Sequence, residues 1–175
     1  MRSILFFVHD IYEDLELWYP KIRLEEAGFK TIIAGPEKQA THLGKHGYPC
    51  KADISFDDAD PQTFAGLVIP GGYAPDKMRR IPKALDIVRQ MNEEKKLIAF
   101  ICHAGWVPIS AKILKGRHLT GFSAIKDDLE NSGAIYADKP VVVDGNLVTS
   151  RTPADLPFFC KAILEVLIPF EKIKS

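Results

Sequence analysis

Cys102 is the residue of this chain whose surroundings are best suited to chemistry. It comes directly after an apolar run, Leu97 to Ile101, and before a segment that predicts a helix. Ala104 and Gly105 are small enough for a sharp strand-to-helix turn, which can hold a reactive side chain exposed. A helix N-terminus lowers the pKa of a thiol from about 8.5 to roughly 3.5–7.5. We therefore predict a reactive thiolate here, although an isolated cysteine is more often a small buried apolar residue.

Two further groups of residues follow predicted strands. Pro70-Gly71-Gly72 ends the apolar run 66–69. Its two glycines can present backbone N–H groups as an oxyanion hole, although Pro-Gly is also common in ordinary turns. Glu13 lies before a predicted helix, where an acid usually serves as a cap. If Glu13 instead reached Cys102, its carboxyl could stabilise the thiolate and act as a general acid–base.

The remaining histidines give weaker signals. His9 ends a strand and either lines the cleft or packs beside it, whereas His42, His46 and His118 lie in polar segments where we expect them to be solvated. None of these histidines has metal-ligand spacing, and the three cysteines are far apart. We therefore predict no metal, no cofactor and no disulfide framework, which fits a reducing cytoplasm.

The chain that must position these residues alternates strand-like and helix-like segments. Apolar runs predict buried strands at 3–8, 30–34, 66–69 and 97–101. Amphipathic patterns predict helices at 14–27, 82–94, 104–114 and 154–167; the first has an apolar stripe that includes Leu15 and Ile22. Short strands are expected within 37–60, and a hairpin around Asp144-Gly145 at 141–149. Repeated β-α-β units predict an α/β fold with a mostly parallel sheet, whose carboxyl edge carries the site.

Composition narrows the function further. The 175 residues are 46% apolar and 26% charged, with a formal net charge of +0. This length predicts a single domain over residues 1–175. A neutral chain lacks the basic field of a nucleic-acid or anionic-membrane binder, so we expect neither partner. No apolar stretch approaches the ~20 residues that a bilayer span needs.

Several motifs together resemble the ThiJ/PfpI superfamily, close to the PfpI branch, whose members are described as intracellular cysteine peptidases. The resemblance spans nearly the whole chain, and the order and spacing of the motifs make it specific. The matching segments are Tyr-Glu-Asp-Leu-Glu-Leu at 12–17, Gly-Lys-His-Gly at 44–47, Val-Ile-Pro-Gly-Gly-Tyr-Ala-Pro-Asp at 68–76, Ile-Cys-His at 101–103, Leu-Lys-Gly-Arg at 114–117, and Val-Asp-Gly-Asn-Leu-Val-Thr-Ser-Arg-Thr-Pro-Ala-Asp-Leu at 143–156.

The resemblance implies a flavodoxin-like three-layer α/β sandwich and assigns roles to the candidate residues. It implies that Cys102 is the nucleophile, that Glu13 contacts its sulfur as a protonated acid, and that His103 is the neighbouring catalytic residue. It also implies an oxyanion hole formed by the backbone of Gly71, Gly72 and His103.

The resemblance also implies self-association, as a dimer or a hexamer. In the PfpI branch an acidic residue reaches the histidine of the site from a neighbouring subunit, and the matching position here is Asp76. One segment departs from the family pattern, because Ala104-Gly105-Trp106 replaces the usual Gly-Pro after Cys-His. Trp106 therefore either walls the pocket and changes substrate choice or packs between helices.

Three functions compete at this stage. The first is a cofactor-free thiol enzyme that acts on reactive carbonyls, as in glyoxalases, which convert methylglyoxal to lactate, and deglycases. The second is a cysteine peptidase, although a histidine next to the cysteine commonly points away from its sulfur and is then a poor base. The third is a redox sensor or holdase chaperone with a readily oxidised thiol. The substrate is accordingly a small carbonyl compound or a peptide, and we favour the first function.

Overall fold

A seven-stranded sheet forms the centre of the computed structural model, which describes residues 2–168. The strand order is β10-β11-β7-β6-β1-β2-β5, and every neighbouring pair is parallel except the hairpin β10–β11. The predicted α/β class with a mostly parallel sheet is therefore confirmed. The strands are β1 (Ser3–Phe7), β2 (Lys30–Gly35), β5 (Ile54–Ser55), β6 (Phe64–Ile69), β7 (Leu97–Ile101), β10 (Val141–Asp144) and β11 (Leu147–Ser150).

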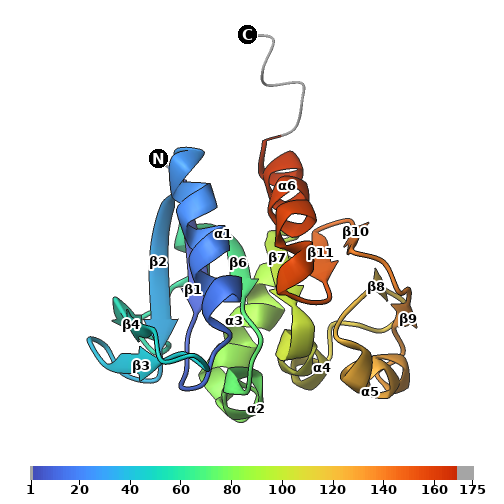
Figure 1. Ribbon diagram of the computed structural model, residues 1–175, viewed down its shortest axis with the longest axis horizontal. Helices are drawn as coiled ribbons and strands as arrows, with labels where there is room; N and C mark the ends of the chain where they lie inside the picture. Colours follow the sequence, from blue (N-terminus) through green and yellow to red (C-terminus); the bar gives the residue numbers. More distant parts are fainter. Residues whose placement is uncertain (1, 169–175) are drawn as a thin grey trace, which may run out of the picture.

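Helices cover both faces of this sheet (Figure 1). α1 (Asp14–Glu26) and α6 (Leu156–Leu167) lie side by side on one face, and α3 (Pro82–Glu93) covers the other together with α4 (Trp106–Ala111). The central strands β1, β6 and β7 are buried on both faces, which explains why they are almost entirely apolar. Their carboxyl ends meet at one edge of the sheet, and the candidate residues follow them.

The segment 37–60 contains the short strands that we expected. β3 (Thr41–Leu43) and β4 (Pro49–Lys51) form an antiparallel hairpin, and β5 joins the edge of the main sheet. The helix predicted at 104–114 is shorter than expected: a 3₁₀ turn at Cys102–Gly105 precedes α4, which ends where Lys112 adopts a left-handed φ of 60°. Four elements were not predicted: α2 (Ala74–Met78), α5 (Lys126–Asn131), β8 (His118–Leu119) and β9 (Ile135–Tyr136).

The apolar stripe predicted on α1 is partly wrong. The helix buries Leu17, Pro20 and Leu24, whereas Leu15 and Ile22 are 56% and 60% exposed. The outer face of α1 is therefore also apolar. A sequence pattern reports which positions are apolar, but it does not tell which of two apolar faces the sheet will cover.

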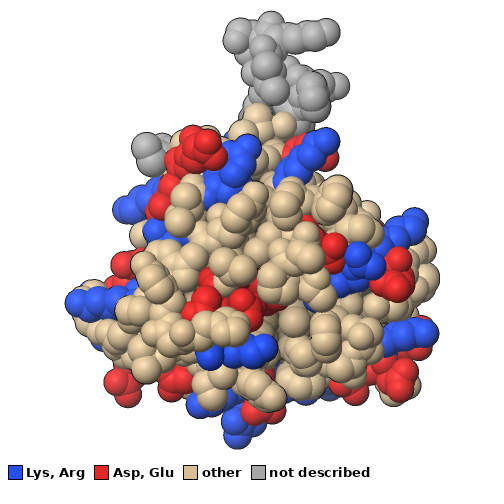
Figure 2. Space-filling model, viewed as in Figure 1, with Lys and Arg blue, Asp and Glu red and all other residues tan. Residues whose placement is uncertain are grey.

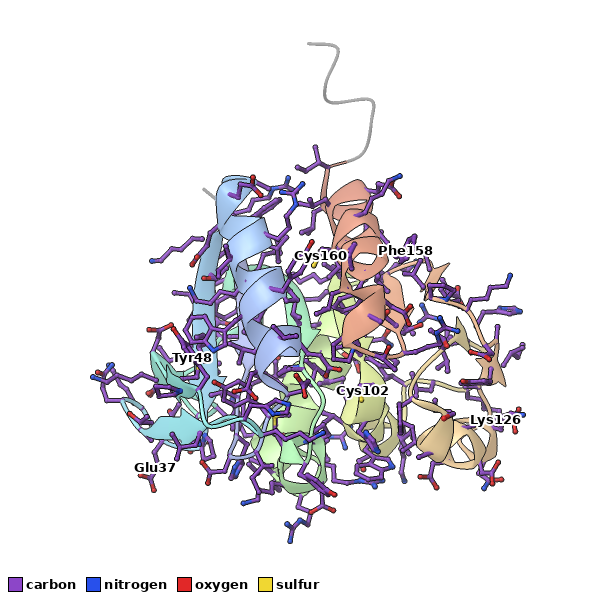
Figure 3. All side chains as sticks on the ribbon, in the orientation of Figure 1. Glu37, Tyr48, Cys102, Lys126, Phe158 and Cys160 are labelled. Carbon is purple, nitrogen blue, oxygen red and sulfur yellow. The ribbon has the colours of Figure 1, made fainter. Side chains whose placement is uncertain are left out.

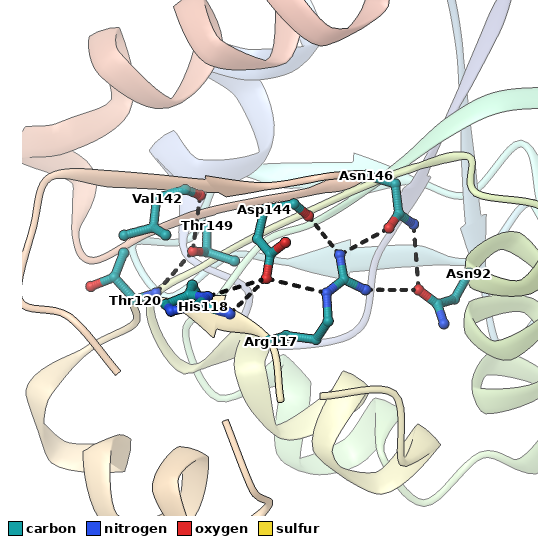
Figure 4. A network of polar contacts seen from close by, with 8 residues as sticks. All are labelled: Asn92, Arg117, His118, Thr120, Val142, Asp144, Asn146 and Thr149. Atoms are coloured by element: carbon teal, nitrogen blue, oxygen red, sulfur yellow. Dashed lines mark hydrogen bonds and ion pairs between the residues drawn. The ribbon is translucent and has the colours of Figure 1, made fainter. Parts of the chain in front are cut away.

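A polar network around Arg117 ties the region of β8 to the β10–β11 hairpin and α3 (Figure 4). The guanidinium of Arg117 donates to the backbone oxygen of Asp144 at 2.6 Å and to Asn146 Oδ1 at 3.0 Å. It also reaches Asn92 on α3 at 3.4 Å. The Asp144 carboxylate accepts the backbone N–H of His118, which holds the pKa of Asp144 below its usual value. Two motifs of the family resemblance, 114–117 and 143–156, thus meet in this network.

Charges of both signs are interspersed among uncharged areas on the face shown in Figure 2. No single-sign field dominates this face, as the balanced composition leads one to expect. Within residues 2–168, none of the helices has the length and apolar character needed to cross a membrane.

Candidate active site

Cys102 stands at the carboxyl end of β7 in a strained backbone conformation. Its φ is +62°, a left-handed value that side chains other than glycine seldom adopt, and its side chain is largely buried. The sharp turn predicted between strand and helix is therefore observed. Figure 3 shows Cys102 at the lower end of the sheet, far from Cys160 on α6. The strain indicates that the fold holds this thiol in a fixed orientation.

The thiol of Cys102 is not the low-pKa group that the sequence led us to expect. Burial, followed by the charge of Glu16, raises its pKa to about 12, although the backbone N–H groups of His103 and Gly72 lower it. The expectation rested on a helix N-terminus at the cysteine. Here a 3₁₀ turn begins at Cys102 and three of its residues separate the cysteine from α4, so desolvation outweighs the helix dipole.

Glu16, and not Glu13, provides the carboxyl group at the sulfur. Glu16 is fully buried in the first turn of α1, and its interaction with the Cys102 thiol contributes to the pKa of both groups. Burial raises the pKa of Glu16 to about 8, so the carboxyl holds a proton at neutral pH. Its Oε1 atom has no hydrogen-bond partner among the described residues. A proton on this carboxyl can therefore be donated to a thiolate, and the two groups titrate as a pair.

Glu13 fulfils the alternative role considered for it, that of a helix cap. Its Oε1 accepts the backbone N–H of Leu15 at 3.3 Å at the start of α1. Its Oε2 lies 3.6 Å from Nε2 of His46, which is exposed. Glu13 also lines the cavity above Cys102, so it borders the site without being the acid predicted at the sulfur.

The two glycines after β6 have different roles. The N–H of Gly71 donates to Oε2 of Glu16 at 2.7 Å, so this donor of the predicted oxyanion hole is already engaged. A Cβ at Gly71 would lie 2.6 Å from that same oxygen and 2.8 Å from the Cβ of Cys102. Gly71 therefore positions Glu16, whereas the N–H groups of Gly72 and His103 face the sulfur.

His103 lies closer to the sulfur than expected for a residue adjacent to the cysteine. Its Nδ1 is 3.3 Å from Sγ of Cys102, which is within hydrogen-bonding distance. Its ring is held between Trp106 and Phe122, with centroid distances of 5.2 and 4.8 Å. Burial and then the positive charge of Lys45 lower the pKa of His103, so its ring is neutral at pH 7. A neutral imidazole at this distance can accept the thiol proton.

Trp106 lines the pocket and also packs against neighbouring elements, and its effect on substrate choice remains a prediction. Its ring lines the cavity beside Cys102 and packs edge-on against His103. Its indole N–H donates to Asp128 on α5 at 2.9 Å, and the guanidinium of Arg79 lies over the ring. The departure from the family pattern at 104–106 therefore gives the pocket an aromatic wall anchored to α5.

Asp76 lies on α2 at the surface. Its carboxylate pairs with Arg80 at 3.2 Å, and it is more than half exposed. Within residues 2–168 of one chain, it makes no recorded contact with His103. Its contribution across a subunit interface remains a prediction.

A cavity of about 340 Å³ lies above Cys102 and His103. Glu13, Glu16, Trp106 and Phe122 line it, together with Lys45 from the loop between β3 and β4. A larger apolar depression of about 630 Å³ beside Trp18 does not include Cys102.

Sequence reasoning missed Glu16 and Lys45. Both lie inside motifs already noted, 12–17 and 44–47, and that was the available signal.

Comparison with known proteins places this geometry in a family. The sequence model of the DJ-1/PfpI family matches residues 2–166. The chain belongs to the DJ-1/PfpI family. It is 45% identical over 165 residues to a protein of Pyrococcus furiosus named Deglycase PfpI, covering 94% of this chain and 99% of that one. YraA of Bacillus subtilis, whose name proposes a cysteine protease, is 39% identical over 166 residues, covering 95% and 98%.

Solved structures of the family have the same fold. The crystal structure of Drosophila melanogaster DJ-1beta superposes with a TM-score of 0.91 at 30% sequence identity, covering 99% of this chain and 94% of that one. The recognition of the ThiJ/PfpI family and the flavodoxin-like architecture expected from it are thus confirmed.

Proposed function

We propose that this chain is a cysteine-dependent enzyme, independent of cofactors, that acts on reactive carbonyl compounds as a glyoxalase or deglycase. One observation carries the proposal: the Cys102 thiol lies in a small cavity between a neutral imidazole and a carboxyl group with a pKa of about 8. The cavity volume of about 340 Å³ suits a small molecule. The names of archaeal relatives at about 45% identity support the same class of chemistry.

The first step is attack on the aldehyde carbon of a substrate such as methylglyoxal. His103 accepts the thiol proton through Nδ1 as the sulfur forms a bond to carbon. The carbonyl oxygen receives a proton from Glu16, which yields a hemithioacetal. The backbone N–H of Gly72 and His103 and the ammonium group of Lys45 stabilise negative charge that develops on the oxygen.

The second stage moves a proton between adjacent carbons. The Glu16 carboxylate, now ionised, removes the proton from the former aldehyde carbon and returns it to the ketone carbon, while the hydroxyl proton on the first carbon passes to the oxygen of the second carbon. The first carbon is oxidised and the second is reduced within one molecule, leaving a thioester of lactate. Water then cleaves the thioester, releasing lactate and restoring the thiol, so that methylglyoxal and one water give lactate.

Peptide hydrolysis is the second candidate. The 3.3 Å separation of Cys102 Sγ and His103 Nδ1 favours it, because such a pair can perform acyl transfer. The cavity is small, however, and a peptidase requires room for an extended chain. A redox-sensing or chaperone role, in which Cys102 is oxidised and turnover is incidental, is the third.

Association of subunits is part of the proposal. Within one chain, no described residue other than Cys102 hydrogen-bonds to the His103 ring. We propose that Asp76 of a neighbouring subunit supplies a carboxylate to this ring in a dimer or hexamer. The short side chain of Asp76 then requires the α2 helix of the neighbour to approach the site closely.

The test compares methylglyoxal and an unfolded protein as substrates for the wild type and Cys102→Ala. Cys102-dependent formation of lactate without proteolysis supports the proposal. Cys102-dependent proteolysis without lactate favours the peptidase. No turnover of either substrate leaves the sensor or chaperone.

A further inference from the structure

Three metal-ligating side chains converge at the carboxyl end of β1, outside the Cys102 cavity. His9 and Asp10 lie just beyond the end of β1, after Val8, and His42 extends from β3. One donor atom from each lies within 4.8 Å of the other two. We propose that His9, Asp10 and His42 bind a divalent transition-metal ion, with Zn²⁺ as the best match. Sequence spacing could not reveal this site, since 32 residues separate Asp10 from His42.

The distances between the donor atoms are close to those of a zinc site. Nδ1 of His42 lies 2.9 Å from Oδ1 of Asp10, and Nδ1 of His9 lies 3.9 Å from Oδ2 of Asp10. Tetrahedral ligands about 2.0–2.1 Å from Zn²⁺ are roughly 3.3 Å apart. Nδ1 of His9 accepts the backbone N–H of Asp10 at 2.7 Å, so metal binding requires the His9 ring to give up that hydrogen bond. Two imidazoles, one carboxylate and a water molecule form a common four-ligand set for this ion.

The burial of the three side chains differs in a way that suits metal binding. His42 is only 6% exposed, contrary to the expectation that it is solvated. Its Nε2 is buried without a polar partner, and a Cβ at Gly35 would lie 3.1 Å from it. The ring is therefore fixed with Nδ1 directed at Asp10. The Asp10 side chain is 49% exposed, which leaves room for a solvent ligand and a path of entry.

One cation competes for this site. Nζ of Lys77 lies 4.0 Å from Oδ2 of Asp10, and the charges of Lys77 and Arg80 also act on His9. Metal binding requires Lys77 to turn away from Asp10, which its partly exposed side chain allows. Because Lys77 competes with the metal ion for Asp10, we predict that removal of the Lys77 charge strengthens metal binding.

A second cluster, formed by Glu13, Asp14 and His46, is a weaker candidate. Both carboxylate oxygens of Asp14 already accept backbone N–H groups, one from His46 and one from Tyr48. The Asp14 side chain therefore stabilises the loop between β3 and β4 and has less capacity to bind a cation. His46 nevertheless provides a matched control variant for the proposed site.

A metal at the proposed site would stabilise the connection that leads to the active site. Ile11 follows Asp10 with a left-handed φ of 63°, and its oxygen accepts the N–H groups of Tyr73 and Ala74. The same connection continues to Glu13 and α1. Bound Zn²⁺ would clamp this strained segment to β3. The inference does not depend on the chemistry of Cys102.

The test is a titration with Zn²⁺ alone in a Cys102→Ser background, which removes the reactive thiol as a competing ligand. We expect one equivalent of Zn²⁺ by calorimetry and a higher melting temperature on binding. Asp10→Asn and His9→Gln, both at partly exposed positions, should weaken binding at least about tenfold, because each removes a protein ligand. Lys77→Met should strengthen it, and His46→Gln should leave it unchanged.

Substitution with Co²⁺ gives an independent readout of geometry. We expect an intense visible absorption typical of four-coordinate Co²⁺ that disappears in His9→Gln and persists in His46→Gln. The proposal is overturned if the Cys102→Ser protein binds no Zn²⁺. It is equally overturned if binding is abolished by His46→Gln and preserved in Asp10→Asn.

Discussion

The pairing of Glu16 with Cys102 makes a prediction in which thiol reactivity and turnover change in opposite directions. In the wild type the Gly71 N–H lies 2.7 Å from Oε2 of Glu16. Glu16→Gln keeps an acceptor for this N–H, but its side chain can neither ionise nor transfer a proton. In the wild type, a pKa of about 8 at Glu16 means that the carboxyl becomes negative before the thiol does. This charge is the second cause, after burial, of the high pKa of Cys102.

The neutral amide removes that charge, so the pKa of Cys102 should fall toward its ordinary value. Above about pH 8, where Glu16 of the wild type is ionised, a fall of one unit raises the thiolate fraction about tenfold as long as the pH stays below the pKa of the thiol. Turnover of methylglyoxal should nevertheless decrease by about 10²–10⁴, the usual contribution of a general acid–base.

Two assays measure these effects separately. The rate of alkylation of Cys102 by iodoacetamide, followed from pH 7 to 10, reports the thiolate, and lactate formation reports turnover. Cys102→Ser defines the background from Cys50 and Cys160, which are buried. If alkylation and turnover of Glu16→Gln fall in parallel, Glu16 does not act on the sulfur in the way we describe.

Three further predictions follow from the geometry. Because the folded-state pKa of Glu16 is raised from 4.5 to about 8, the unfolding free energy should decrease as pH rises between these values, and denaturant titrations of Glu16→Gln should lack this slope. Gly72→Ala should destabilise the fold by more than about 1 kcal/mol in such titrations, since its Cβ would lie 2.5 Å from the Ile11 oxygen. Gly47→Ala, at a similar φ with open space, should cost less, and equal losses would contradict the steric argument. Asp76→Ala should lower turnover without unfolding the chain, whereas unchanged kinetics would remove Asp76 from the site.

Much of the fold could be predicted because its central strands are buried on both faces. Such strands are continuous apolar runs, as in Leu97–Ile101, and their order along the chain implies β-α-β units. The elements that were missed are short. α2 has five residues and α5 has six, which is too few for a helical period to be visible. The outward apolar face of α1 misled the assignment of its buried residues.

The site was predictable as a location and less so as a set of contacts. A cysteine after a buried strand marks the carboxyl edge of the sheet, and the strained φ of Cys102 followed from the turn. Glu13 and Glu16 are both acids within the same first turn, so sequence alone cannot tell which one faces the sulfur. That choice depends on the rotation of α1 about its axis. The high pKa of Cys102 depends on burial, which only the packed structure defines.

The most direct test of the central claim is the conversion of methylglyoxal to lactate by the purified protein, compared with Cys102→Ala. We predict that the wild type forms lactate without added cofactor and that the variant, although folded by circular dichroism, forms none above the uncatalysed rate. Equal lactate formation by the two proteins would contradict the assignment of Cys102 as the nucleophile of a carbonyl-directed enzyme.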